Sequence, residues 1–342
     1  MPEIEIQDLK REAGPISRSL IAEIRKAHSE GRQSILFLNR RGFSYYFHCR
    51  SCGYEMTCKN CSVSLTFHKS QNQMICHYCG YRARPVDICP ECRSIDVGYS
   101  GYGTEHIEEE IARIFPDLIV KRIDTDTVRK KQYLRNILAD FRAGKIDILL
   151  GTQMVAKGLN FPGVKLVGII SADTGLQLPD FRAAERTFNL IVQVSGRAGR
   201  SHPDGKVIIQ TFRPDNETIR LAAQGKLDEY YRKELRVRKD LNFPPFSRLI
   251  RLVFRAKSSR KALKSAQEFM KRLSRLTDED SFNVLGPAEC PLSVIAGNHR
   301  WQLLFQSESF SKAHRLIRET MESFQPLSGV YVEVDVDPVS LL

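Results

Sequence analysis

The chain has 342 residues, of which 42% are apolar and 27% are charged, and it carries a formal net charge of +12. This composition is ordinary for a globular protein of two or three domains and excludes a disordered or fibrous chain. No apolar run reaches the roughly 18 to 20 residues that span a bilayer, and the charged N-terminus does not resemble a signal peptide. We therefore expect a cytoplasmic protein without a membrane partner.

Outside a cysteine-rich stretch, the hydrophobic pattern alternates between helix and strand. Helical spacing covers residues 17–29, and residues 34–38 form a short continuous apolar run. Further strands are expected at residues 118–124, 146–152, 164–170 and 206–211, and further helices at 104–115, 130–143 and 183–195. Buried strands interleaved with helices indicate a parallel α/β sheet. We therefore expect one α/β domain over residues 1–212, interrupted by the cysteine-rich stretch.

The cysteine-rich stretch holds eight of the nine cysteines as four CxxC pairs: Cys49/Cys52, Cys58/Cys61, Cys76/Cys79 and Cys89/Cys92. Eight thiolates are enough for two tetrahedral zinc sites of four cysteines each, whereas disulfides are a poor alternative in a chain without a secretion signal. For any single pair, a redox dithiol is the competing interpretation. Cys290 stands alone and is expected to be a small buried apolar residue.

The order of the pairs favours a nested arrangement of the two sites. The 14 residues between the second and third pairs have the length of a hairpin that folds one knuckle onto another. Nesting predicts one zinc held by Cys49, Cys52, Cys89 and Cys92, and a second zinc held by Cys58, Cys61, Cys76 and Cys79. Both shells are closed and leave no open position for a reactive water, so we expect structural zinc. The nearby His48, His68 and His77 are expected to be surface or packing residues.

We expect two further segments to contact a ligand, because ligands of a parallel sheet bind where its strands end. The strand at 146–152 leads into Gly151, Thr152, Gln153, Lys157 and Gly158. The helix at 183–195 leads into Gln193, Arg197 and Arg200, with small residues between the arginines. Planar guanidinium groups suit phosphate oxygens, as in an arginine finger. The alternative is a glycine-rich helix end whose charges are merely solvated.

These segments resemble motifs of superfamily 2 helicases. ILFLNRRG at residues 35–42 resembles motif IV, GTQMVAKG at 151–158 resembles motif V, and QVSGRAGR at 193–200 resembles motif VI. With four CxxC pairs after motif IV, DFRAAER before motif VI and FPPF further on, the chain resembles the PriA family of replication-restart helicases, also called primosomal protein N′. The resemblance covers essentially all 342 residues.

The resemblance implies that residues 1–212 are the second RecA-like lobe of a helicase. It also implies that the motif V residues contact DNA and couple it to the nucleotide, and that Gln193, Arg197 and Arg200 reach the ATP phosphates. The sequence departs from the family pattern at Leu159 and Asn160, where relatives usually carry His followed by His or Asp.

Two parts of an ATP site do not occur in this sequence. There is no GxxxxGK[ST] loop, and no apolar strand ends in a DEAH-like box. These parts cradle the ATP phosphates and hold Mg²⁺. We therefore expect them in a preceding lobe, and we expect this chain alone not to hydrolyse ATP.

The last hundred residues show a different pattern. After helices at 216–224 and 226–241 and the FPPF stop at 243–246, the order is strand 248–256, helix 259–276, strand 282–286, strand 299–306, helix 309–324 and strand 329–336. This β-α-β-β-α-β order predicts an α+β ferredoxin-like domain. Residues 181–276 hold 23 basic and 9 acidic side chains, a footprint suited to nucleic-acid phosphates or to solvated helix faces. Trp301 is expected in the core, with base stacking as the alternative.

Together these features predict a RecA-like lobe at residues 1–48 and 93–212, a zinc-binding insertion at 49–92, a basic helical linker at 213–243 and a C-terminal DNA-binding domain at 244–342. The resemblance implies an ATP-dependent 3′ to 5′ DNA helicase of the cytoplasm and nucleoid that restarts replication at stalled or branched forks by primosome assembly. Its implied partners are branched and single-stranded DNA, single-stranded DNA-binding protein and other primosome components. The alternative is a non-enzymatic zinc-ribbon adaptor that binds nucleic acid.

Overall fold

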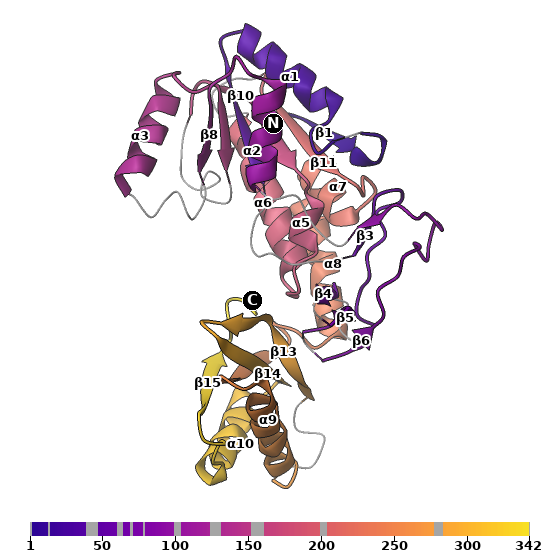
Figure 1. Cartoon of the computed structure of the whole chain (residues 1–342), viewed down its shortest axis with the longest axis vertical. Coiled ribbons are helices and arrows are strands. Elements are labelled where there is room, and N and C mark those ends of the chain that lie inside the picture. The colour runs from indigo at the N-terminus through magenta and orange to yellow at the C-terminus, as the bar shows by residue number, and fades with distance from the viewer. Residues whose placement is uncertain are drawn as a thin grey trace.

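The computed structural model describes residues 2–12, 14–38, 47–59, 64–68, 71–77, 79–98, 104–123, 131–151, 161–198, 204–276 and 283–341. Figure 1 shows an α/β part, a strand-poor element beside it, and a second sheet with two helices at the far end. Within the described stretches, no helix is both long and apolar enough to cross a bilayer.

The α/β part is built on a six-stranded parallel sheet, which confirms the predicted fold class. The strand order is β1 (Glu3–Asp8), β11 (Lys206–Thr211), β10 (Val164–Ile170), β2 (Gln33–Leu38), β9 (Ile148–Gly151) and β8 (Val120–Ile123). Every pairing between these neighbours is parallel. The edge strand β1 was not predicted from the sequence. It leads into a short 3₁₀ helix, η1 (Leu9–Arg11).

Helices cover both faces of this sheet, which explains the continuous apolar strands. On one face, α1 (Arg18–Ser29) and α2 (Thr104–Ile114) pack over residues such as Leu36 and Leu150. On the other face, α3 (Lys131–Arg142), α6 (Ala183–Ala198) and α7 (Glu217–Ala223) pack over residues such as Phe37 and Leu149. The short helix α5 (Asp173–Leu176) precedes α6, and α8 (Leu227–Asp240) follows α7.

The cysteine-rich element contains little regular structure. Its base is the two-stranded pairing of β3 (His48–Cys49) with β7 (Val97–Gly98), and its far end is an antiparallel sheet of β4 (Thr66–His68), β5 (Gln73–Ile75) and β6 (Arg82–Ala83). The core of this element is shared with the last part of the chain. Phe47, Leu65 and Met74 belong to one buried cluster with Phe243, Leu249, Leu304 and Leu341.

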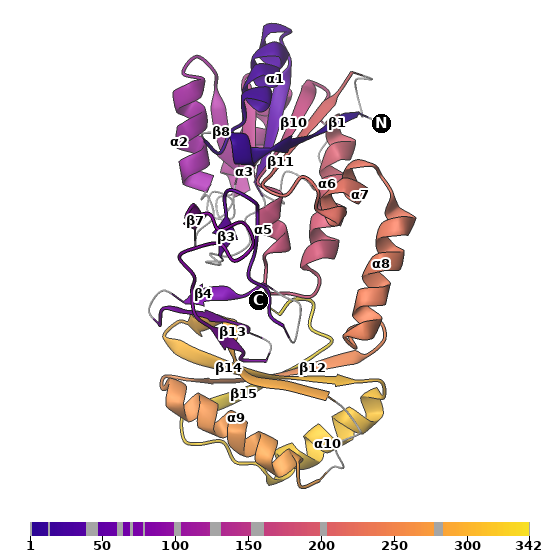
Figure 2. The same cartoon turned by 90° about the vertical axis from the view of Figure 1, so that its right-hand side faces the viewer.

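The last part of the chain has the predicted split β-α-β-β-α-β arrangement. Its elements are β12 (Arg248–Ala256), α9 (Ser259–Leu273), β13 (Asn283–Ile295), β14 (Asn298–Ser307), α10 (Phe310–Ser323) and β15 (Val330–Val336). The antiparallel sheet has the order β13-β14-β12-β15, and both helices lie on its face away from the α/β part (Figure 2).

Two sequence expectations for this part have clear outcomes. Trp301 lies in the core, 8% exposed, and its indole Nε1 donates a hydrogen bond to Ser259 Oγ at 3.0 Å. The base-stacking alternative is therefore not supported. β13 extends to Ile295 instead of ending near residue 286, because the strand continues past register shifts in its pairing with β14. Pro287 is tolerated there because β13 is an edge strand with an irregular ladder.

Candidate functional site

The first cysteine cluster has the geometry of a tetrahedral thiolate site. The Sγ atoms of Cys49, Cys52, Cys89 and Cys92 all lie within 4.8 Å of one another. Cys49 Sγ is 3.6 Å from Cys92 Sγ, and Cys52 Sγ is 3.6 Å from Cys89 Sγ. Sulfur atoms about 2.3 Å from a tetrahedral Zn²⁺ lie roughly 3.8 Å apart, so the observed spacing fits that ion.

The second cluster consists of Cys58, Cys76 and Cys79, again within 4.8 Å of one another. Cys58 Sγ and Cys79 Sγ are 3.6 Å apart. The expected fourth ligand, Cys61, lies outside the described residues. Among the described cysteines, the first CxxC pair therefore groups with the fourth, and the second groups with the third.

Three of the CxxC pairs are held by the same backbone turn. In each, the first cysteine donates from its N–H to the carbonyl five residues on and accepts from the N–H four residues on; the first cysteines are Cys49, Cys76 and Cys89. The residue that donates this N–H has a positive φ: 79° at Gly53, 76° at Gly80 and 62° at Arg93. A left-handed residue is what this turn requires, which accounts for the two glycines.

Burial and close contact between thiols shift the pKa values of cysteines in the first cluster. Burial, together with the thiols of Cys92, Cys89 and Cys49, raises the pKa of Cys52 to about 12. Burial also acts to raise the pKa of Cys89, but backbone hydrogen bonds from Cys92 and Glu91 lower it to about 7. A thiol whose pKa is about 12 stays protonated at neutral pH unless a metal ion supplies the compensating charge.

Of the nearby histidines, His77 has the expected packing role. His77 is fully buried, and its Nδ1 lies 2.8 Å from the carbonyl oxygen of Glu289. Gln302 Nε2 donates to the carbonyl of His77 at 2.6 Å. The cysteine-rich element is thus joined to β13 and β14 by hydrogen bonds as well as by apolar contacts.

The motif VI residues lie at the C-terminal end of α6. Gln193 and Arg197 are one turn apart, with Gln193 exposed and Arg197 half-buried, while Val194 and Ala198 face the core. A Cβ added to Gly196 would meet no atom within 4 Å, so the space beside this glycine is open. Arg200 lies outside the described residues.

The motif V segment is described only at its start. Gly151 is the last residue of β9 and pairs with Ile123 of β8 and Phe37 of β2. Thr152, Gln153, Lys157 and Gly158 lie outside the described residues, as do Leu159 and Asn160. Their roles stay predictions.

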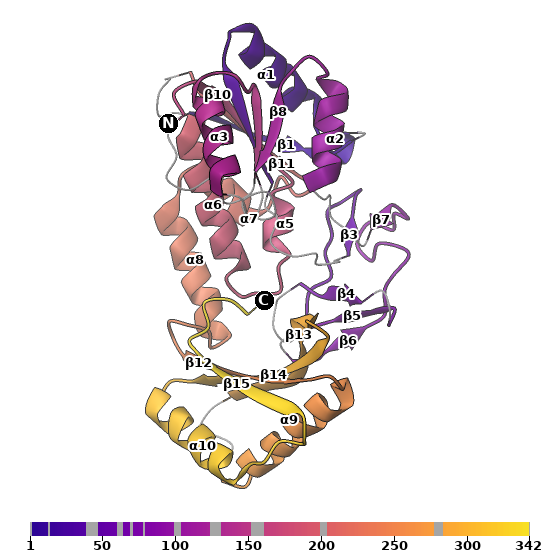
Figure 3. The same ribbon diagram turned by 60° about the vertical axis from the view of Figure 1, so that its left-hand side comes forward.

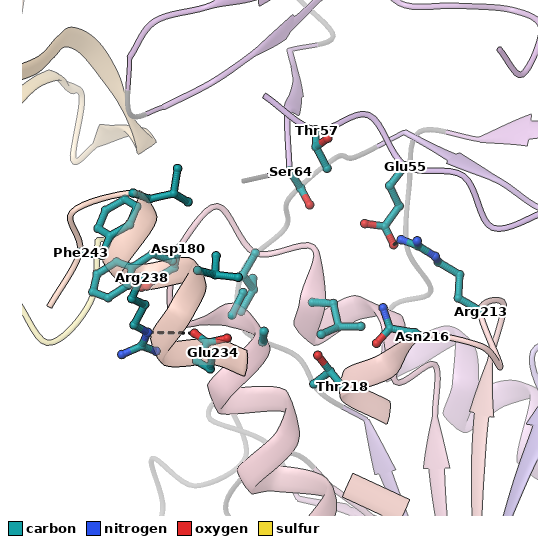
Figure 4. A pocket seen from close by; sticks show the side chains of 17 residues that line it. Glu55, Thr57, Ser64, Asp180, Arg213, Asn216, Thr218, Glu234, Arg238 and Phe243 are labelled. Carbon is teal, nitrogen blue, oxygen red and sulfur yellow. Dashed lines mark hydrogen bonds and ion pairs between the residues drawn. The ribbon is translucent and has the colours of Figure 1, made fainter. Parts of the chain in front are cut away.

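The ends of β10 and β11 are joined by a buried carboxylate. Asp173 accepts hydrogen bonds from Thr211 Oγ1 at 2.7 Å and from the N–H of Phe212 at 2.9 Å. Burial raises the pKa of Asp173. Arg213, which follows Phe212 in the chain, forms an ion pair of 3.2 Å with Glu55 of the cysteine-rich element (Figure 4).

Glu55 is one of the residues that line a cavity of about 240 Å³ between the cysteine-rich element, α8 and the segment that leads into α6 (Figure 4). Its lining mixes apolar and charged side chains, and the charged side chains already have partners. Asp180 pairs with Arg186, and Glu234 pairs with Arg238. Side chains from separate parts of the chain therefore line this cavity. Each charged side chain among its described lining residues has a partner of opposite charge.

Stability should depend on pH through Glu55. Burial raises its pKa, although the charge of Arg213 opposes the shift. A carboxyl whose pKa is raised on folding stabilises the fold while protonated, and that contribution is lost as pH rises through the folded pKa. We expect Glu55→Gln to gain stability over the parent as pH rises from about 5 to about 8, since the unfolded pKa is about 4.3.

Urea unfolding of the parent and Glu55→Gln chains at both pH values measures this effect. Glu308→Gln, at an exposed position on the loop before α10, is the matched control. A stability difference between parent and Glu55→Gln that is the same at both pH values would contradict the burial argument.

Comparison with known proteins places these features in one family. Residues 58–84 match the model for the PriA DNA helicase Cys-rich region, residues 99–202 match the helicase conserved C-terminal domain, and residues 239–339 match the primosomal protein N C-terminal domain. Replication restart protein PriA of Treponema pallidum is 49% identical over 341 residues, which cover 100% of this chain and 52% of that protein. The chain belongs to the PriA family.

Two other members of the PriA family are similarly related. The protein of Borreliella burgdorferi is 38% identical over 99% of this chain and 51% of its own length, and that of Bacillus subtilis is 36% identical over 100% of this chain and 43% of its own length. The chain thus spans about half the length of the curated relatives it matches. Both the Cys-rich region match and the two thiol clusters support structural zinc.

Sequence reasoning missed the residues that join the parts of the chain. These are Glu55, Arg213, Asp180, Arg182 and Arg186. The last three lie in the DFRAAER segment. In the sequence, this segment drew attention only because it resembles the PriA family pattern. No local pattern reveals their partners, because those partners are far away in the sequence.

Proposed function

We propose that this chain supplies the second lobe, the zinc element and the C-terminal part of an ATP-dependent 3′ to 5′ DNA helicase. In that protein it acts at stalled or branched replication forks and supports restart by primosome assembly. The observation that carries the proposal is the PriA family match together with the place of Gln193 and Arg197 one turn apart at the C-terminal end of α6. The proposal includes the division of the chain into a RecA-like lobe at residues 1–48 and 93–212, a zinc-binding insertion at 49–92, a basic helical linker at 213–243 and a C-terminal DNA-binding domain at 244–342.

Each motif has a proposed role. Zinc would be held by Cys49, Cys52, Cys89 and Cys92, and a second ion by Cys58, Cys61, Cys76 and Cys79. Gln193, Arg197 and Arg200 would contact the phosphates of ATP, whose hydrolysis supplies the free energy of unwinding. Gly151, Thr152, Gln153, Lys157 and Gly158 would contact DNA. The Mg²⁺ ligands and the phosphate cradle would come from another lobe, so this chain alone would not turn over ATP.

The first test is direct. Purified chain, mixed with ATP, Mg²⁺ and forked DNA, should hydrolyse ATP no faster than the buffer does. Hydrolysis above that background would contradict the proposed division of labour. The same sample should bind branched and single-stranded DNA, and the proposed protein partners, single-stranded DNA-binding protein and primosome components, should be sought with it.

The C-terminal part would supply a DNA-binding surface, and the contacts of its basic side chains support one location for it. Ten basic residues mark its first half: Arg248, Arg251, Arg255, Lys257, Arg260, Lys261, Lys264, Lys271, Arg272 and Arg275. Six of them are less available to DNA, because they are buried or already interact with other groups of the chain. Three form ion pairs with acidic side chains, one is buried, and two donate to backbone carbonyls.

The remaining four, Arg260, Lys264, Lys271 and Arg275, form a stripe along α9 and its C-terminal end. All four are exposed, and within the described part of the chain no ion pair joins them to a carboxylate. Steps of four, seven and four residues keep the side chains on one helical face, about 6, 10 and 6 Å apart along the axis. A row of cations at this spacing suits a polyphosphate backbone.

Removing stripe cations should weaken DNA binding in a salt-dependent way. We expect Lys264→Ala with Lys271→Ala to reduce the slope of log affinity against log salt by about 0.9 for each lost phosphate contact with duplex DNA. Fluorescence anisotropy of forked DNA over a salt series measures the slope. Lys312→Ala on α10, also exposed, is the control. An unchanged slope in the double variant would place the DNA elsewhere.

A further inference from the structure

The last described residues of the chain lie between the α/β part and the C-terminal sheet, where the label C stands in Figures 2 and 3. We define residues 337–341 as the C-terminal tail. Leu341 is 0% exposed and belongs to the buried cluster that also contains Phe47 and Phe243. The tail is therefore an internal part of the joint and not a loose extension.

The tail is held by residues 180–186, which we call the docking segment. Arg182 Nη1 donates to the carbonyl of Pro338 at 3.1 Å, and Arg186 Nη2 donates to the carbonyl of Val339 at 2.6 Å. In return, the N–H of Leu341 donates to Asp180 Oδ2 at 3.2 Å. Two arginines and one aspartate thus bind the tail through its backbone.

The docking segment is itself braced. Arg186 Nη1 lies 3.0 Å from Asp180 Oδ2, and the Asp180 side chain is 0% exposed. Phe181 stacks on Phe243, with ring centroids 4.6 Å apart and an interplanar angle of 5°, and the Arg182 guanidinium lies 4.1 Å from the Phe181 ring. The buried Asp180 carboxylate interacts with both an arginine and the tail N–H. Loss of either partner would destabilise the fold, because it would leave a buried charge less well compensated.

The opposite end of the tail is fixed to its own sheet. The Asp337 carboxylate forms an ion pair with Arg248 and accepts from the N–H of Leu249, both at the start of β12. The N–H of Asp337 donates to the carbonyl of Leu249 at 2.7 Å. The tail therefore ties the edge of the C-terminal sheet to the docking segment.

The docking segment includes the first turn of α6, and the last turn of the same helix carries Arg197. Sixteen helical residues form a rod about 24 Å long, so movement at one end is transmitted to the other. We propose that the docking segment is a binding site for the C-terminal tail, and that through α6 it couples the motif VI arginines to the orientation of the C-terminal part. The coupling half of this inference rests on the proposed function; the docking half does not.

Docking is tested on the chain itself. Ending the chain after Asp337 should speed amide hydrogen exchange in residues 180–186 at least about tenfold, as expected when a stabilising contact of about 1.4 kcal/mol is removed. A synthetic peptide of residues 335–342 should restore protection, and the same peptide with Leu341→Asp should not. Unchanged exchange in the shortened chain would overturn the docking site.

A point variant separates docking from general destabilisation. Arg186→Ala should speed exchange in the tail, whereas Arg113→Ala, which removes an exposed ion pair with Glu110 on α2, should leave the tail unchanged. Equal effects of the two variants on the tail would also overturn the docking site.

Coupling is tested in a protein that carries both helicase lobes. The tail-shortened form should keep its hydrolysis rate without DNA, while stimulation by forked DNA falls at least about fivefold, the lower end of typical coupling between sites. Normal stimulation together with lost docking would overturn the coupling. Absence of hydrolysis in the protein with an intact tail would reject the proposed function and leave the docking result standing.

Discussion

Replacing Arg197 and Arg200 with alanine, in a protein that carries both helicase lobes, is expected to lower ATP hydrolysis by a factor on the order of 10³ to 10⁵. Guanidinium groups that reach the phosphates stabilise charge that develops in the transition state, so their loss acts on the rate of hydrolysis. DNA binding should stay close to normal, because it depends on other cations. Steady-state hydrolysis and anisotropy on the same preparations measure both quantities.

The control for this experiment is Arg135→Ala, an exposed arginine on α3. It removes the same charge from the same lobe at a position outside the motifs. Unchanged hydrolysis in the Arg197 and Arg200 variant would show that these arginines do not serve ATP. It would favour the alternative role for this chain, a zinc-ribbon adaptor that binds nucleic acid and whose α/β part is a scaffold.

Removing zinc is expected to unfold the cysteine-rich element and to loosen its joint with the C-terminal part. Structural zinc contributes about 10 to 16 kcal/mol of apparent binding free energy in zinc-finger peptides, and here the ion would hold a small core. That core includes Leu249 and Leu304 of the C-terminal sheet, so the loss should spread beyond the element. We expect a chelator to lower the melting temperature and to raise hydrogen exchange in both places.

Single ligands can be tested without a chelator. Cys52→Ala should reduce the metal content from two zincs to one, whereas Cys290→Ala, which removes a buried thiol of the C-terminal part, should leave both. Because thiolates bind the metal, acidification should also release it. A chain with no zinc and with reversible disulfides would instead support the interpretation of the CxxC pairs as redox dithiols.

Most regular elements were predictable because their signals are local. The continuous apolar runs of β2, β9, β10 and β11 reflect burial on both faces of the sheet. The strand β1 also had a local signal, because its alternation of Glu and Ile is typical of a half-exposed strand; only its place at the sheet edge beside β11 required the structure. The length of β13 was missed because a proline normally marks a strand end, and here it lies in an irregular edge strand.

The candidate site divides in the same way. Spacing alone suggested which CxxC pairs group together, since the length of chain between pairs limits which thiols can meet. Spacing could not tell which of the ten basic residues near α9 are available for DNA. That depended on where carboxylates such as Asp337 and Glu333 lie, and both come from β15 and the turn after it.

The sequence by itself determined the α/β and ferredoxin-like folds, the thiol clusters and the helicase motifs, because each is encoded by neighbouring residues with a fixed period or spacing. Only the tertiary structure decided how the parts are joined. The Asp180 carboxylate and the Leu341 N–H are 161 positions apart in the chain, and no local preference of either residue specifies the other. Their contact follows from the packing of the cysteine-rich element, the C-terminal sheet and Phe181 into one shared core, which exists only in the folded molecule.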